Sequence, residues 1–140
     1  IPWTRLLCER RTTGPNDKPI DLPNFVRRHR ARLVLKPNRS CGGQGVTIGP
    51  VTTQSHWEEM LGQALVEPNT WVVQELIPIP RRRTVELGPN GRFKAKTVYA
   101  VYGLFCSPFG VAFVGRASGS PVVNVMQGGG MLSILGRHSG

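Results

Sequence analysis

The sequence predicts an α+β fold made of two small halves with mostly antiparallel sheets. One segment, residues 53–66, has the apolar spacing of an amphipathic helix, whereas most other apolar runs are short and bounded by glycine or proline. The 17 glycines and 12 prolines gather at a few positions, which is typical of loops between strands. We expect an extended lead-in over residues 1–30, an α+β half over 31–79 and a β-rich half over 80–140.

The first half is expected to begin with a short helix and a strand that ends at a proline. Asp21-Leu22-Pro23 is a helix-start signal, and the apolar residues after it continue a helical pattern. Residues 32–36 form a short buried strand, which Pro37 stops because it has no N–H to donate. A glycine-rich loop over 38–45 follows, and residues 46–48 form a second short strand.

The clearest helix covers residues 53–66. Its apolar residues recur at helical spacing on one face: Trp57, Met60, Leu61, Ala64 and Leu65. Ser55 and Glu58 have the spacing of a capping box, and Pro68-Asn69 ends the helix. Residues 71–77 then form a strand, which the following proline halts.

The second half alternates strands with tight turns. Gly88-Pro89-Asn90-Gly91 and Ser107-Pro108-Phe109-Gly110 are turn signals between apolar runs. These turns and the glycine triplet Gly128–Gly130 bound the strands that we expect. Their ranges are 84–87, 93–104, 111–116, 122–125 and 131–135.

The charge balance restricts the possible partners and sites. Eighteen Lys and Arg against eight Asp and Glu give a net charge of +10, which favours an anionic partner. The last carboxylate of the chain is Glu86. A metal site in the second half must therefore use Glu86, borrow Glu75 from the first half, or rely on neutral oxygens such as that of Asn124.

Cysteine usage and hydropathy indicate the setting. Three well-separated cysteines give neither a zinc spacing nor a disulfide framework, which fits a reducing cytoplasm. Residues 97–115 and 117–136 are uncharged and long enough to span a membrane, but both contain proline and several glycines, so strands explain them better. The chain opens at Ile1 without Met, so we expect a piece whose first partner is the remainder of a longer protein.

The best chemical signal is Lys36-Pro37 followed by Gly42-Gly43-Gln44-Gly45. A glycine-rich loop offers backbone N–H groups to phosphate oxygens, and a lysine at the end of the preceding strand adds a positive charge. Neither GxxxxGK[ST] nor GxGxxG occurs, and a strand rather than a helix follows the glycines. A β-hairpin with a flexible turn and a solvated lysine is the alternative.

Gln74 and Glu75 form a polar pair inside an apolar strand. Buried without partners such a pair is costly, and a ligand with hydrogen-bonding groups would satisfy it. The alternative is an edge strand whose polar side chains face water. Arg116, Asn124 and the glycine triplet are a third signal, because Arg binds phosphate and Asn offers an oxygen to Mg²⁺, although each alone is more often structural.

Together these segments resemble the ATP-grasp family. Its members pair a strand ending in Lys-Pro with a mobile Gly-rich loop, follow it with a hinge strand of roughly Val-Gln-Glu-x-Ile, and place a metal-binding Asn on a late strand. The matching segments here are Val34–Pro37, Gly42–Gly49, Val72–Ile77 and Val123–Val125. The sequence of these segments is most similar to the circularly permuted branch of the family, to which glutathionylspermidine-synthase-like proteins are related. The resemblance covers about residues 1–135.

The resemblance implies a nucleotide site between the two halves, with ATP and Mg²⁺ as ligands. Lys36 would contact the phosphates of ATP. The loop would close over those phosphates through Ser40, Gly42, Gly43 and Gly45. The adenine pocket would be lined, mainly through backbone groups, by Gln74, Glu75 and Ile77.

The resemblance also implies the chemistry. Arg116 would be the catalytic residue that neutralises phosphate charge during transfer, and Asn124 and Glu86 would ligate Mg²⁺. In such enzymes a substrate carboxylate attacks the γ-phosphate to give an acylphosphate, and an amine or thiol then displaces phosphate. We therefore expect a ligase that joins a carboxylate to an amine or thiol, on small molecules or peptides.

The chain departs from the family pattern at its metal site. Most members have an acidic residue two positions before the metal-binding Asn, where this chain has Val122, so Glu86 is the one plausible carboxylate. A catalytically incomplete ATP-grasp-like binding or structural module is therefore the alternative. The basic runs Arg27–Arg32 and Arg81–Arg83 raise nucleic-acid binding as a third hypothesis, but few aromatic residues lie among the arginines and we expect no nucleic acid.

Overall fold

The computed structural model describes residues 1–8 and 10–134, and its contacts divide the chain into two compact units, Ile1–Ile77 and Pro78–Gly140. Within the described residues, all neighbouring strands are antiparallel. Both α-helices, α1 (Leu22–Arg28) and α2 (Gln54–Val66), belong to the first unit. The predicted α+β class with antiparallel sheets is confirmed.

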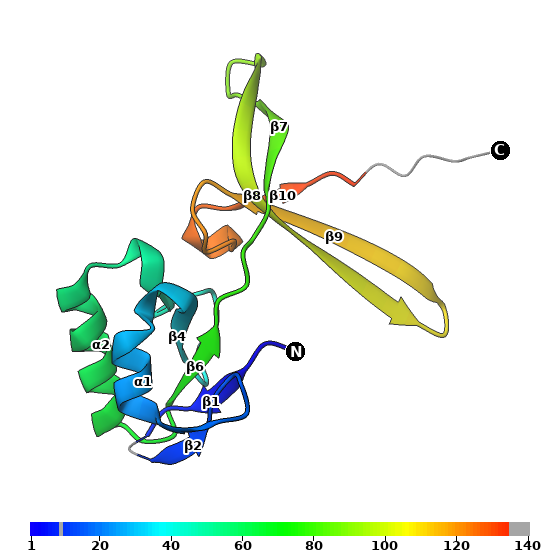
Figure 1. Ribbon diagram of the computed structural model, residues 1–140. Coiled ribbons are helices and arrows are strands. Elements are labelled where there is room, and N and C mark those ends of the chain that lie inside the picture. The colour runs from blue at the N-terminus through cyan, green and yellow to red at the C-terminus, as the bar shows by residue number, and fades with distance from the viewer. Residues whose placement is uncertain (9, 135–140) are drawn as a thin grey trace. The chain divides into compact units, whose positions relative to one another are not determined.

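The first unit contains a four-stranded sheet with two helices on one face (Figure 1). The strand order is β1-β6-β4-β5, with bounds Thr4–Leu6 for β1, Trp71–Glu75 for β6, Leu33–Pro37 for β4 and Thr47–Ile48 for β5. A separate hairpin pairs β2 (Arg11–Thr13) with β3 (Pro19–Asp21). The edge strand β1 thus comes from the segment that we expected as an extended lead-in.

The core of the first unit lies between the helices and this sheet. It consists of Leu7, Leu22, Val26, Leu33, Leu35, Trp57, Leu61, Ala64, Trp71 and Val73, with Met60 and Leu65 packed against it. The predicted apolar face of the second helix is therefore confirmed as its core face. The Trp57 ring is fully buried, and its Nε1–H donates to the Val26 carbonyl at 3.3 Å, so the buried polar atom has a partner.

Strand alternation places a second set of side chains on the face of the sheet that the helices do not cover. Leu33 and Leu35 of β4 lie in the core, so Lys36 lies on the opposite face. Val73 of β6 lies in the core, so Gln74 lies on the opposite face as well. Because β6 has neighbours on both sides, the alternative of an edge strand is wrong, although the Glu75 side chain is exposed to water as that alternative expected.

Both helices begin at a side-chain cap. Asp21 caps α1 by accepting from the Asn24 N–H at 3.0 Å, as the helix-start signal predicted. Thr53 caps α2 by accepting from the His56 N–H at 3.3 Å. The capping box predicted at Ser55 is wrong, because the helix starts at Gln54 and Ser55 already lies inside the first turn.

The second unit is a four-stranded sheet in the order β10-β9-β8-β7 (Figure 1). The bounds are Arg81–Leu87 for β7, Phe93–Ser107 for β8, Gly110–Ser118 for β9 and Gly130–Leu132 for β10. Both predicted turns join neighbouring strands, and the Gly88 N–H closes the first by donating to the Arg92 carbonyl at 2.9 Å. Leu135, the end of the last predicted strand, lies outside the described residues.

The strand predicted over 122–125 is wrong. A short 3-10 helix, η3 (Val125–Gln127), occupies the end of that segment. The Asn124 side chain caps it by accepting from the Met126 N–H at 2.8 Å, and Gly128 ends it with a φ of +77°. An apolar run alone cannot distinguish a strand from a turn that a side-chain cap stabilises.

The ends of β8 and β9 extend past both neighbouring strands as a two-stranded arm. Four apolar side chains on one face of this arm are each more than half exposed, namely Tyr102, Leu104, Val111 and Phe113. The uncharged stretch over 97–115 therefore forms strands, as predicted. Among the described residues, no helix combines the length and the apolar character that crossing a membrane would require.

Candidate functional site

Lys36 is a half-buried cation without an anionic partner. Its ammonium donates to the Oε1 atom of Gln74 on the neighbouring strand. The ion pairs of the described residues join Arg27 to Glu58, His56 to Glu59 and Lys96 to Glu86, so Lys36 belongs to none of them. Burial lowers the pKa of Lys36, because removing water disfavours the charged form. An anionic ligand would supply the missing counter-charge.

The Gln74 side chain connects Lys36 to the edge of the sheet. Its Nε2 donates to Thr4 Oγ1 at 2.9 Å, and Thr4 Oγ1 donates to the Pro2 carbonyl at 3.1 Å. Sequence reasoning assigned Gln74 to the adenine pocket and gave Thr4 no role. The polar side chain of Gln74 thus has partners on two other strands, and its contact with adenine stays a prediction.

The glycine-rich loop packs closely against the end of β4 at Gly45. Gly42, Gly43 and Gly45 all have φ between +69° and +75°, a region that side chains other than glycine rarely adopt. A Cβ on Gly45 would lie 2.7 Å from the Pro37 ring. The loop between the antiparallel strands β4 and β5 thus returns to the Lys36-Pro37 dipeptide, and phosphate binding by it stays a prediction. Ser40 is exposed within the loop.

Two backbone N–H groups of the hinge segment after Gln74 already have partners within the first unit. The Glu75 N–H donates to the Trp3 carbonyl at 2.8 Å, and the Leu76 N–H donates to the Arg32 carbonyl at 2.8 Å. Ile77 follows the end of β6, and its side chain is 57% exposed. Adenine binding by Glu75 and Ile77 stays a prediction, and the Glu75 amide proton is not available for it.

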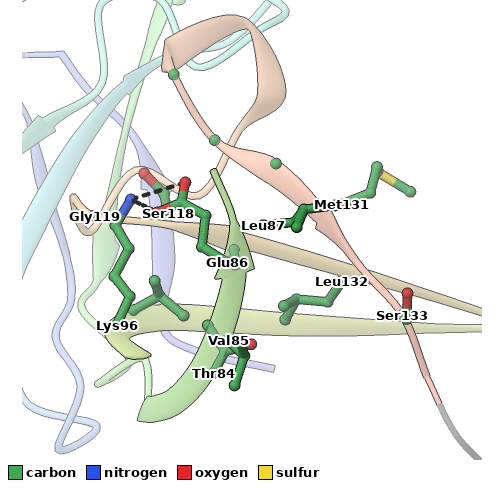
Figure 2. A pocket seen from close by; sticks show the side chains of 15 residues that line it. Thr84, Val85, Glu86, Leu87, Lys96, Ser118, Gly119, Met131, Leu132 and Ser133 are labelled. Atoms are coloured by element: carbon green, nitrogen blue, oxygen red, sulfur yellow. Dashed lines mark hydrogen bonds and ion pairs between the residues drawn. The ribbon is translucent and has the colours of Figure 1, made fainter. Parts of the chain in front are cut away.

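The second unit has its own cavity of about 440 Å³, in which the Glu86 carboxylate points to Lys96 (Figure 2). One wall carries Glu86 and Lys96, whose charged groups lie 3.0 Å apart as an ion pair. Ser118 of β9 and the triplet Gly128–Gly130 also line the cavity. The structure thus brings together Glu86 and the glycine triplet, which lie far apart in the sequence, and adds Lys96, which sequence reasoning missed.

Arg116 and Asn124 do not line this cavity. Arg116 alternates along β9 with Ala117, which does line it, so the Arg116 side chain lies on the other face of the strand. Asn124 instead holds the turn together, because its Oδ1 caps η3 and its carbonyl accepts from the Gly129 N–H at 2.9 Å. The catalytic role of Arg116 stays a prediction.

The residues expected to ligate Mg²⁺ do not make a complete site by themselves. Mg²⁺ demands octahedral oxygen coordination, whereas the Glu86 carboxylate is paired with Lys96 and the Asn124 oxygen accepts a backbone N–H. Among residues 1–8 and 10–134, no three His, Cys, Asp or Glu residues are grouped so as to hold a metal ion. The donors therefore do not fit a resident Mg²⁺.

Several arginines of the basic runs serve the fold. Arg30 Nη1 donates to the Gly49 carbonyl at 2.6 Å and to the Thr52 carbonyl, and Arg27 pairs with Glu58 at 3.3 Å. Arg81 lies over the Tyr99 ring at 5.5 Å. These contacts explain part of each run without a nucleic-acid ligand.

Comparison with known proteins finds no matching family model. An uncharacterized protein of Mycobacterium tuberculosis is 34% identical over 104 residues, which is 70% of this chain and 18% of that protein. An uncharacterized protein of Synechocystis is 27% identical over 117 residues, or 76% of this chain and 23% of that one. The chain thus spans about a fifth of the length of these relatives.

A Frankia alni protein named "Putative glutamate--cysteine ligase 2-3" is 32% identical over 102 residues, which is 71% of this chain and 12% of that protein. A Frankia casuarinae protein of a similar name is 33% identical over the same length. These similarities fit a ligase-like relationship. The matched segment is a small part of each Frankia protein, so the printed name describes a much longer chain.

Proposed function

We propose that this chain is the ATP-binding part of an ATP-grasp ligase that joins a carboxylate to an amine or thiol. The observation that carries the proposal is Lys36, which is half-buried, free of ion pairs and followed by a proline packed against the glycine-rich loop. The ligase names of the Frankia relatives support the reaction class. The net charge of +10 supports a polyanionic ligand.

In this proposal each group acts by position and charge. The Lys36 ammonium holds phosphate oxygens of ATP, and the loop glycines present backbone N–H groups to them. Arg116 neutralises charge on the transferred phosphoryl group. The substrate carboxylate oxygen attacks the γ-phosphorus, which forms an acylphosphate and releases ADP. The amine nitrogen or thiol sulfur then attacks the acyl carbon, and inorganic phosphate leaves.

Hydroxylamine trapping tests the reaction, because hydroxylamine converts an acylphosphate to a hydroxamate, which forms a coloured complex with ferric ion. The intact protein is incubated with ATP, hydroxylamine and a panel of carboxylic acids that includes glutamate. The proposal predicts hydroxamate formation that needs both ATP and one acid, and that Lys36→Met abolishes. ATP-independent hydroxamate, or equal rates in the variant, would contradict it.

A catalytically incomplete nucleotide-binding module is the second candidate. The engagement of Glu86 with Lys96 and of Asn124 with its own turn favours it, because these oxygens are then not free for a metal–nucleotide complex. This candidate predicts saturable ATP binding that depends on Lys36, without hydroxamate formation or phosphate release from any acid of the panel.

A further inference from the structure

We propose that Thr4 is a positioning residue for the phosphate-binding lysine: it anchors the Gln74 amide, which in turn holds the Lys36 ammonium. The inference rests on the proposed binding of ATP phosphates by Lys36. It assigns Gln74 a side-chain role beside the backbone contacts to adenine that the family resemblance implies.

The three side chains lie on one face of the sheet, on three adjacent strands. Thr4 of β1 is directly opposite Gln74 of β6, and Gln74 is opposite Val34 of β4. Lys36 is two residues further along β4, which makes it the diagonal neighbour of Gln74 and within reach of a long side chain. The antiparallel register therefore aligns the three groups in a row across the sheet, with the Gln74 amide between the Thr4 hydroxyl and the Lys36 ammonium.

The hydrogen bonds in this row have a direction. The Thr4 hydroxyl donates its single proton to the Pro2 carbonyl at 3.1 Å, so towards Gln74 its oxygen can only accept. The Gln74 amide must therefore turn its NH₂ group to Thr4, at 2.9 Å, which leaves its carbonyl oxygen facing Lys36. Without the Thr4 oxygen the NH₂ group of Gln74 loses its acceptor, and only the contact with the ammonium then holds the amide beside Lys36.

A neutral acceptor at position 74 suits an anion site. The ammonium has three donors, and Gln74 accepts from one of them. Two N–H groups and the whole positive charge then stay available for phosphate oxygens. A carboxylate at the same place would neutralise the charge, so Gln74→Glu is expected to keep the lysine in position but weaken binding of a triphosphate.

ATP titration of the intact protein tests the inference with a double-mutant cycle. Thr4→Val removes the hydroxyl at nearly constant volume and should weaken ATP binding about three- to tenfold, the effect of one hydrogen bond to a charged row. Thr4→Ser should restore most of the affinity. Thr13→Val, on the exposed strand β2, is the matched control and should bind as the wild type does.

The double variant separates positioning from general destabilisation. If Thr4 acts through Lys36, then Thr4→Val combined with Lys36→Met binds ATP no more weakly than Lys36→Met alone. Additive losses, or wild-type affinity in Thr4→Val, would overturn the positioning role. If Thr4→Val does not fold, the ATP affinity of Gln74→Glu is measured instead. An affinity equal to that of the wild type would overturn the inference that position 74 holds the Lys36 ammonium. Wild-type affinity in Lys36→Met would instead refute the proposed function itself.

Discussion

An added methyl group at Gly49 would meet backbone atoms at closer range than one at Gly115 or Gly129. Gly49 opens a 3-10 turn, η2 (Gly49–Val51), that packs against a second one, η1 (Arg30–Arg32). A Cβ there would lie 2.7 Å from the Arg30 carbonyl carbon and 2.9 Å from the Leu33 oxygen, and still closer to the Arg30 oxygen. The Arg30 guanidinium already holds the same turn through the Gly49 carbonyl.

The magnitude follows from the kind of atoms involved. Overpacking in a core typically costs about 1–3 kcal/mol, and the low values require neighbours that can rotate away. All three neighbours of a Gly49 methyl are backbone atoms, so we expect Gly49→Ala to lose about 3 kcal/mol of unfolding free energy. Proteins of this size have about 5–15 kcal/mol in total, so the melting temperature should fall by about 10 °C.

Thermal unfolding followed by circular dichroism checks this value. Gly62→Ala is the matched control, because a Cβ at Gly62 in the middle of α2 meets nothing within 4 Å. Alanine is the better helix former by about 0.5–1 kcal/mol, so this variant should melt slightly higher than the wild type. Melting of Gly49→Ala within about 2 °C of the wild type would refute the packing of these two turns.

Three further predictions follow from single residues. Gly129→Ala places a Cβ 2.6 Å from the Asn124 oxygen and should cost about 2 kcal/mol in chemical unfolding, whereas Gly130→Ala, with nothing within 4 Å, should cost little. Thr53→Ala should lose about 1 kcal/mol through the cap of α2, and an equal loss in Ser55→Ala would contradict that cap. ATP affinity should fall as pH rises through the lowered pKa of Lys36, because the ammonium loses its proton. The ATP affinity of Lys36→Arg should not change over the same pH range. Since the unfolded chain holds more protons between that pKa and the ordinary lysine value, folding stability should rise with pH over the same interval.

Local patterns in the sequence were sufficient for most elements of the fold. Residues 54–66 carry a helical apolar face, and Pro37 and the turn at 88–91 bound strands by chemistry that acts within a few residues. Thr53 was not identified as the cap of α2 because Ser55, two residues later, also carries a hydroxyl group that could cap a helix. The strand expected near Asn124 failed because a single side-chain hydrogen bond stabilises a turn there.

The site was less predictable, because its parts meet through strand register. Lys36 and Gln74 were identified separately, from a lysine before glycines and from a polar residue among apolar ones. Their contact depends on Val34 facing Gln74, and a shift of one residue would move Gln74 to the helix-covered face. Thr4 lies on a three-residue strand without an apolar pattern, so nothing in the sequence marked it.

The pairing of Glu86 with Lys96 has the same cause. The turn residues 88–91 suggest a hairpin but do not fix its loop length, and the pairing of Leu87 with Phe93 sets a five-residue loop. That register places Lys96 diagonally across from Glu86, on the same face of the sheet. The Glu86 carboxylate, which the sequence suggested as a metal ligand, is thus paired with Lys96 in the structure.

Calorimetric titration with ATP tests the central claim, that Lys36 is a receptor for nucleotide phosphates. It is run on the intact protein with and without Mg²⁺, and with adenosine and GTP as competing ligands. We expect saturable binding that prefers ATP to GTP, is much weaker for adenosine, and is strongly weakened but still measurable in Lys36→Met. Absence of binding to the wild type, or equal affinity for ATP and adenosine, would contradict it.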